Sequence, residues 1–308
     1  MESVPRRTRS ILPFVVLAAL AATLPLLALA LRGHSGGSAP AAAPSGSGIA
    51  EPRLPPPGGV VLARESGRLA VALSARSEGG RLALTATVLG PDGGGASGRR
   101  VAFRGGGRRV VGAPCGSGCY SAVLRGRLRR ITVVVGGADV PFELPARARP
   151  AAAFVRQVAA SLRRARSLVI DERLASSPTH AIHARFEVAA PERLTYRIAG
   201  GADAVVIGGR RWDRASRSEA WIPSPQTLLR LPTTTWTSVR DARLVASGPR
   251  FATVTFLDPH IPAWFEVRID KRTLRPSEVR MTAASHFMRD RYSHYDARIR
   301  IRPPSAKR

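Results

Sequence analysis

Lysine is almost absent from this sequence: Lys271 and Lys307 are the only two, so arginine supplies nearly all of the 48 basic residues. Only 21 residues are acidic, which leaves a formal net charge of +27. Such a charge is typical of nucleic-acid binding, but the arginines are spread over most segments and are not interleaved with aromatic residues, which make up 6%. The wealth of arginine, alanine, glycine and proline is also typical of a GC-rich genome. We therefore expect no nucleic-acid partner, and a basic face suited to anionic lipid head groups.

The sequence also lacks recognisable catalytic motifs. The sequence has no nucleophile elbow, no His-Glu-x-x-His, no phosphate-binding loop and no spaced carboxylate pair in a recognisable scaffold. Asp171, Glu172 and Asp258 are interpreted as strand-edge or turn residues. We therefore predict that the protein is not an enzyme.

The N-terminus contains one long apolar run, ILPFVVLAALAATLPLLALAL, over residues 11–31. As a helix it is long enough to cross a hydrocarbon core of ~30 Å, and the arginines in residues 1–10 predict that this short segment is cytoplasmic. A cleaved signal peptide is the alternative, because Ala28-Leu29-Ala30 has the small-x-small form of a cleavage site. The sequence predicts a single-pass plasma-membrane protein whose C-terminal domains are extracytoplasmic.

Residues 32–59 are mostly Gly, Ser, Ala and Pro and are predicted to form a linker. From residue 60 to 145, short apolar strands alternate with turn residues such as Pro91-Asp92-Gly93, which predicts an all-β sandwich. The loop GPDGGGASG, the strand RRVAF, a Gly-Cys-Tyr turn and the strand ITVVVGG resemble the YtkA-like or CopC-like immunoglobulin-type domains of bacterial envelope proteins. The resemblance implies a domain found beside copper-resistance membrane proteins.

Residues 150–303 begin with the segment AAAFVRQVAASLRRARSL, whose apolar residues fall mostly on one helical face. A long series of strand-like segments follows, ending in RIRIRPP, and SPQTLLRLPTTTWTS is expected to interrupt them with a short helix. The opening FVRQVAASLRRARSLVIDERL, the strand FEVAAPERLTYRI and the tail FLDPHIPAWFEVRIDKRTLRP resemble the LolA/LppX/LprG-like fold. That resemblance implies an α+β incomplete β-barrel whose concave side holds lipid acyl chains.

The two cysteines, Cys115 and Cys119, lie in the stretch CGSGC. Export into an oxidising compartment favours a disulfide, and the glycines between them permit the tight closure. A redox-active or metal-binding thiol pair and two free thiols are the alternatives. The spacing is similar to the Cys-x3-Cys clamp of copper-delivering Sco proteins, but such sites need a nearby histidine.

A second candidate metal site lies near the C-terminus, where His286, Met288 and His294 offer imidazole and thioether ligands for a soft copper ion. The alternative is that Met288 packs inside the domain while the histidines lie at the surface.

All four tryptophans fall in the second domain, and we expect them to line its core or its ligand cavity. They are Trp212, Trp221, Trp236 and Trp264.

The leading hypothesis is a non-enzymatic envelope protein that binds or senses a hydrophobic, lipid-like ligand in its second domain, with no cofactor. The sandwich is then a spacer or a docking module. Membrane lipid is the expected partner, with an integral membrane protein as a candidate partner. An actinobacterial copper-resistance-type protein with copper as its cofactor is the first alternative, and a structural or interaction protein without a ligand is the second.

Overall fold

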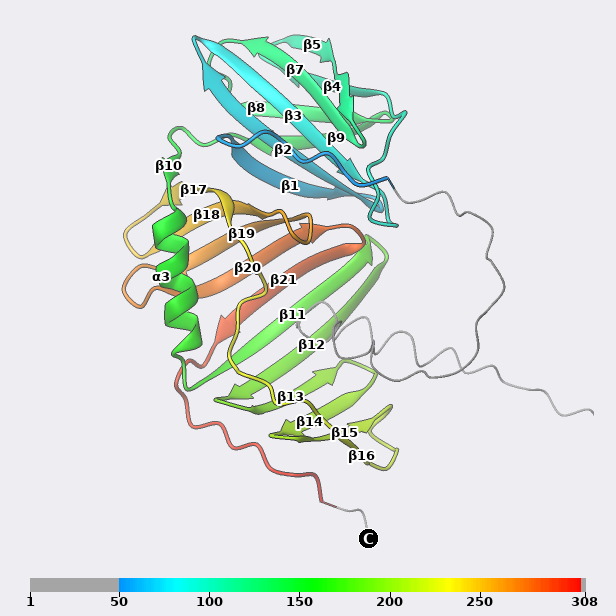
Figure 1. Ribbon diagram of the computed structural model, residues 1–308, viewed down its shortest axis with the longest axis vertical. Helices are drawn as coiled ribbons and strands as arrows, with labels where there is room; N and C mark the ends of the chain where they lie inside the picture. Colours follow the sequence, from blue (N-terminus) through cyan, green and yellow to red (C-terminus); the bar gives the residue numbers. More distant parts are fainter. Residues whose placement is uncertain (1–49, 306–308) are drawn as a thin grey trace, which may run out of the picture. The chain divides into compact units, whose positions relative to one another are not determined.

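The computed structural model describes residues 50–305 (Figure 1). The predicted cytoplasmic segment 1–10, the apolar run 11–31 and most of the 32–59 linker lie outside the described residues. Among residues 50–305, no helix is both long and apolar enough to cross a membrane.

The first domain is a sandwich of two antiparallel sheets, with the orders β1-β2-β3-β7-β6 and β5-β4-β8-β9 (Figure 1). Its core lies between the sheets, where Leu73, Leu84, Phe103, Ile131 and Phe142 are at most 1% exposed. No helix occurs among residues 60–145. The strands are β1 (Val60–Ser66), β2 (Leu69–Glu78), β3 (Arg81–Leu89), β4 (Val101–Gly105), β5 (Arg108–Val111), β6 (Ala113–Gly116), β7 (Cys119–Arg125), β8 (Arg130–Val135) and β9 (Ala138–Glu143).

The second domain contains one twelve-stranded antiparallel sheet, with the order β10-β17-β18-β19-β20-β21-β11-β12-β13-β14-β15-β16. Pairing of the last strand with β11 joins the C-terminal half of the domain to its N-terminal half, so β11 is a central strand. The strands are β10 (Arg149–Pro150), β11 (Ser167–Ser177), β12 (His180–Ala189), β13 (Arg193–Ile198), β14 (Asp203–Ile207), β15 (Arg210–Arg214), β16 (Ile222–Pro225), β17 (Arg240–Ser247), β18 (Phe251–Asp258), β19 (Ala263–Asp270), β20 (Arg275–Ala283) and β21 (His286–Ser293).

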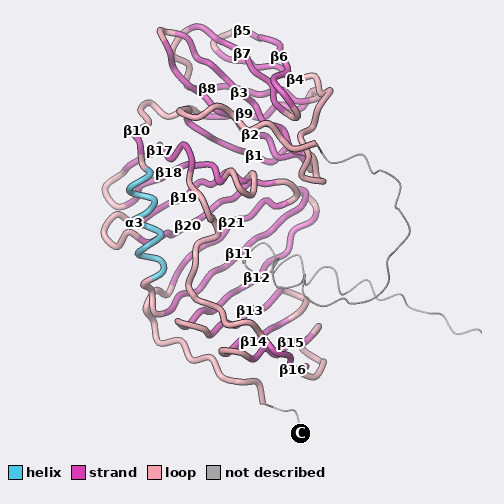
Figure 2. Tube along the Cα trace, viewed as in Figure 1, coloured by secondary structure: helices cyan, strands magenta, loops and turns pink. Residues whose placement is uncertain are grey.

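The single helix of the described residues is α3 (Ala152–Arg163). Val155, Val158 and Leu162 recur at helical spacing and are at most 1% exposed, so burial of this stripe stabilises the helix. The helix packs against β17 and β20, and the Ser161 hydroxyl donates to the Thr273 carbonyl at 3.0 Å. Figure 2 shows how small a share of the trace is helical.

The fold class predicted for residues 150–303, an α+β incomplete barrel of LolA type, was wrong. This domain is almost wholly β, with a single 12-residue helix, and its two end strands β10 and β16 are not paired with each other. The short helix expected within 224–238 is not formed, because Pro225 and Pro232 lack the N–H that a helix interior needs. The strand expected from RIRIRPP is also absent: the alternation buries Ile301, but the segment joins no ladder.

The two faces of the large sheet differ in what covers them. Leu257, Trp264 and Phe287 point toward the sandwich and form a buried cluster with it, so we call this the sandwich face. Because side chains alternate along a strand, their neighbours Phe256, Phe265 and Met288 point to the opposite face. Each side chain along these strands can thus be assigned to one face of the sheet or the other.

Candidate ligand site between the sandwich and the sheet

The sandwich face carries three rows of side chains that run across the strands, because the strands pair in a common register. An apolar row comes first, an arginine row lies two residues along each strand, and a row of alternating charge lies two residues further. The apolar row is Leu257, Trp264, Thr282, Phe287 and Ala175; the arginine row is Glu266, Arg280, Arg289 and Arg173; the alternating row is Arg268, Glu278, Arg291, Asp171 and Arg185.

The apolar row is where the two domains meet. Its members pack against small and branched side chains of β1, β2 and the end of β3, namely Val61, Ala70, Ala72 and Leu89. Trp264 is 2% exposed and Leu257 is fully buried. Burial of this area removes apolar surface from water and so stabilises the junction.

Polar contacts add to the junction on both sides of the apolar row. Arg240 donates to the Pro55 carbonyl at 3.0 Å, and Arg243 donates to the Gly58 carbonyl at 2.8 Å. On the other side, the Ser285 hydroxyl donates to the Pro91 carbonyl at 2.7 Å. Side chains of the second domain therefore hold the backbone before β1 and after β3, so the connecting chain is not the only link between the two domains.

The arginine row is neutralised in part by carboxylates. Glu278 accepts from Arg280 Nε at 2.6 Å and from Arg289 at 2.9 Å. Burial alone would raise the pKa of Glu278, but these two hydrogen bonds bring it below its ordinary value. Glu266 lies 3.7 Å from Arg64 of β1 and 4.0 Å from Arg280. No carboxylate among residues 50–305 lies within 4.0 Å of the Arg173 guanidinium.

A cavity of about 240 Å³ opens between β1 and these rows. Its apolar lining includes Leu62, Trp264 and Phe287, and its charged lining includes the four arginines 64, 173, 280 and 289 together with Glu65 and Glu266. An apolar wall with a few polar groups is the usual composition of a ligand site.

Three buried polar atoms that find no hydrogen-bond partner belong to residues that line this cavity. They are Nε1 of Trp264, Oγ1 of Thr255 and Nε of Arg289. A buried donor without a hydrogen-bond partner lowers the stability of the fold by about 1–3 kcal/mol, so such groups are rare in folded proteins. The indole and guanidinium nitrogens can only donate, which fits a ligand that supplies acceptor oxygens.

The opposite face of the sheet holds a buried pair of carboxyl groups. Glu172 on β11 is in register with Asp290 on β21, and they are 3% and 1% exposed. Burial raises the pKa of Glu172 to about 7, and burial together with the nearby Glu172 charge raises the pKa of Asp290. The Tyr292 hydroxyl donates to Asp290 at 3.3 Å. The interpretation of Asp171 and Glu172 as strand-edge or turn residues was wrong, because both lie within β11, which has a partner strand on each side.

Asp258, the third carboxylate interpreted as a strand-edge or turn residue, is fully buried at the end of β18. It accepts from the backbone and hydroxyl of Thr237, at 2.7 and 2.9 Å, and from the backbone of Ser238 and His260. It therefore fixes the segment before β17 to the sheet.

The four tryptophans do not converge on one cavity. Trp264 lines the cavity on the sandwich face, whereas Trp236 packs on the opposite face, with its ring centroid 5.3 Å from that of Phe256. Trp212 lies on β15, and Trp221, just before β16, has the Arg214 guanidinium 4.4 Å from its ring centroid. Of the candidate ligand residues, the structure thus brings only Trp264 to the cavity.

The candidate copper ligands are also separated. His286 begins β21 and His294 follows its end, so eight residues of extended strand place them about 26 Å apart. Nδ1 of His286 lies 2.9 Å from the Ala284 carbonyl, and Met288 is buried, 2% exposed. Among residues 50–305, no cluster of three His, Cys, Asp or Glu side chains is placed to hold a metal ion.

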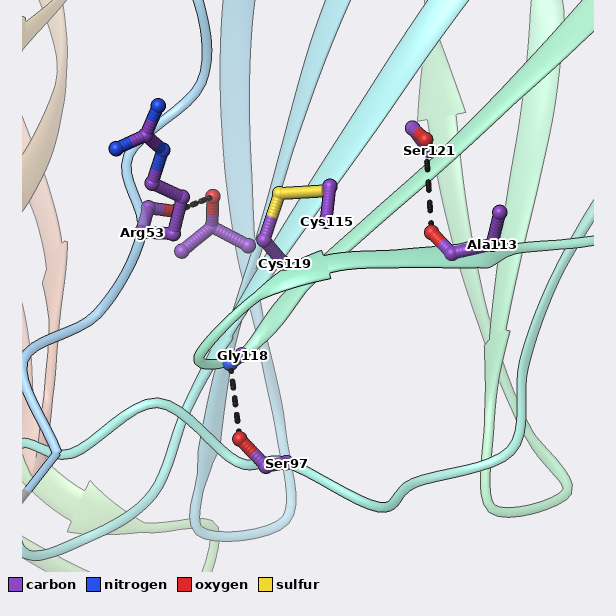
Figure 3. The surroundings of a disulfide bond; sticks show 8 residues. Arg53, Ser97, Ala113, Cys115, Gly118, Cys119 and Ser121 are labelled. Atoms are coloured by element: carbon purple, nitrogen blue, oxygen red, sulfur yellow. Dashed lines mark hydrogen bonds between the residues drawn. A yellow bond between two sulfur atoms is a disulfide. The ribbon is translucent and has the colours of Figure 1, made fainter.

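Cys115 and Cys119 form a disulfide that closes the turn between β6 and β7, with their Cα atoms 5.0 Å apart (Figure 3). Gly118 in this turn has φ +65°, and a Cβ there would lie 2.5 Å from the Val88 carbonyl oxygen, so only glycine fits. Its N–H points to the Ser97 hydroxyl at 3.4 Å. The bridge shapes a surface loop of the sandwich.

Sequence reasoning missed the arginine row, the cavity and the buried carboxyl pair. Each joins strands that are far apart in the chain, such as β11 and β21, so no local pattern marks it. The one signal available was the alternation in EVRM and FMRDRY, which places Arg280, Arg289 and Arg291 on one face of their strands.

No protein-family model matches this chain, and a search of the curated proteins finds no significant match.

Proposed function

We propose that the protein is a non-enzymatic binding protein whose site is the cavity between the sandwich and the sheet, and that its ligand is amphiphilic and lipid-like. One observation carries the proposal: the cavity has an apolar wall of Ala63, Trp264 and Phe287 beside a rim of arginines. Such a wall suits a hydrocarbon chain, and the unpartnered donors beside it suit a polar head.

The disulfide supports a role outside the cytoplasm, because such bonds persist in oxidising compartments. The proposal places the ligand at the domain junction and not among all four tryptophans, because only Trp264 lines the cavity. It also gives the sandwich a direct part in binding, since β1 forms one wall of the cavity.

The test is binding of N-phenyl-1-naphthylamine, an uncharged apolar fluorophore, by the purified full chain, together with native mass spectrometry for co-purified lipid. Ala63→Phe adds a ring at the cavity wall, and Val111→Phe adds the same ring at a site on β5 that is 71% exposed. We expect the fluorescence gain to fall in the first variant and to persist in the second.

If both variants bind the fluorophore like the wild type, the site lies elsewhere and the proposal is wrong. If neither the fluorophore nor any lipid binds the wild type, the cavity serves the packing of the two domains alone.

A further inference from the structure

We propose that the cavity recognises an anionic head group, a phosphate or carboxylate oxyanion, and that Arg173, Arg280 and Arg289 receive it. The inference rests on the proposed function, because it takes the same cavity as the site. It adds the chemical class of the head group and the residues that select it.

The three arginines lie directly opposite one another on adjacent strands. Arg280 pairs directly with Arg289, and Arg289 pairs directly with Arg173, on the adjacent strands β20, β21 and β11. Neighbouring strands are about 4.8 Å apart, so the backbone positions that carry these three positive side chains lie within about 10 Å of one another. Like charges directly opposite each other destabilise a sheet, and a bound anion relieves that repulsion.

Carboxylates are distributed unevenly around the cavity. Glu65 and Glu266 lie on the β1 and β19 side of the cavity, and Glu278 is shared by Arg280 and Arg289. Arg173, at the far side, has no carboxylate within 4.0 Å among residues 50–305. The excess positive charge therefore lies toward Arg173 and Arg289, where an oxyanion is favoured most.

Arg289 has a hydrogen-bond donor that no acceptor satisfies. Its Nε–H is buried without an acceptor, although its terminal nitrogen is bonded to Glu278. Guanidinium groups bind phosphate and carboxylate oxygens through paired, charge-assisted hydrogen bonds. An oxyanion between Arg173 and Arg289 accepts a hydrogen bond from this donor. It also neutralises the Arg173 guanidinium, which has no carboxylate partner.

The experiment is isothermal titration of the full chain with dodecyl phosphate, dodecyl maltoside and inorganic phosphate, each below its micelle concentration where one exists. Arg173→Gln removes the unpaired charge without breaking an ion pair. Arg291→Gln is the matched control, because it removes one arginine charge from the same face of the sheet, on the adjacent strand β21, at a residue outside the cavity. Circular dichroism checks that each variant is folded.

We expect Arg173→Gln to weaken dodecyl phosphate binding about tenfold, the loss of one charge-assisted hydrogen bond, and Arg173→Lys to restore part of it. Dodecyl maltoside binding and the Arg291→Gln variant should stay unchanged. Equal weakening in both glutamine variants would mean general charge attraction and would overturn the inference.

Two further outcomes separate the inference from the proposed function. If dodecyl maltoside and dodecyl phosphate bind equally and Arg173→Gln changes neither, the apolar site stands and the anion inference fails. If inorganic phosphate binds as tightly as dodecyl phosphate, the arginine site stands and the ligand has no need of a hydrocarbon chain, so the amphiphile proposal fails.

Discussion

The buried carboxyl pair of Glu172 and Asp290 makes the stability of the protein depend on pH in an unusual direction. A carboxyl whose pKa is raised in the folded state stabilises the fold fully below its unfolded pKa, and this stability is lost as the pH rises through the folded value. For Glu172 the pKa rises from 4.5 to about 7, which corresponds to about 3 kcal/mol at 1.36 kcal/mol per pH unit. Asp290 acts in the same direction.

Urea unfolding between pH 4.5 and 8.5 measures this effect. We expect the free energy of unfolding of the wild type to fall as the pH rises from 4.5 to about 8. Glu172→Gln resembles the protonated acid, so it should remove most of the loss and be up to about 3 kcal/mol more stable than the wild type at pH 8. Glu143→Gln, at an exposed carboxylate of the sandwich, should keep the wild-type slope.

A wild type whose stability is flat or rising over this range would refute the reasoning, as would a Glu172→Gln variant that keeps the full slope. Asp290→Asn added to Glu172→Gln should leave the profile flatter still, because both raised pKa values are then gone.

Three further predictions concern stability, each checked by urea unfolding at pH 7. Arg214→Ala leaves the Asp203 carboxylate, 3% exposed, without its partner and should cost about 3–5 kcal/mol, whereas Arg130→Ala breaks an exposed pair and should cost under about 1 kcal/mol; similar losses would contradict this. Replacing both cysteines with serine should cost about 2 kcal/mol at most, because the closed loop is short; a loss of 4 kcal/mol or more would assign the bridge a larger role. Gly118→Ala meets backbone at 2.5 Å and should be more damaging than Gly67→Ala, which has a similar φ of +60° and open space around it; equal costs would show that the turn gives way.

The strand pattern of this protein is readable from its sequence, whereas the arrangement of the strands is not. The alternation in FATVTFLD and AWFEVRID predicts strands where β18 and β19 occur, and the helical stripe of Val155, Val158 and Leu162 predicts α3. Local pattern does not say that β21 pairs with β11, across more than a hundred residues. One helix followed by strands therefore favours an α+β barrel on local pattern alone, while the structure has an open sheet.

That same long-range pairing decides which side chains meet at the cavity. Trp236 and Trp264 share a domain but lie on opposite faces of one sheet, and alternation along β19 alone decides which face Trp264 takes. The arginines are spread thinly along the chain, so local pattern does not group them. Antiparallel pairing gathers three of them into one row.

The sandwich covers the apolar row and forms one wall of the cavity. Without it, Leu257, Trp264 and Phe287 would face water beside a row of arginines, and no cavity would exist. With it, these three side chains are at most 6% exposed. A change that loosens the junction, such as Arg240→Ala at the Pro55 contact, should therefore weaken ligand binding although it lies outside the cavity. Undiminished binding in that variant would place the site within the sheet alone.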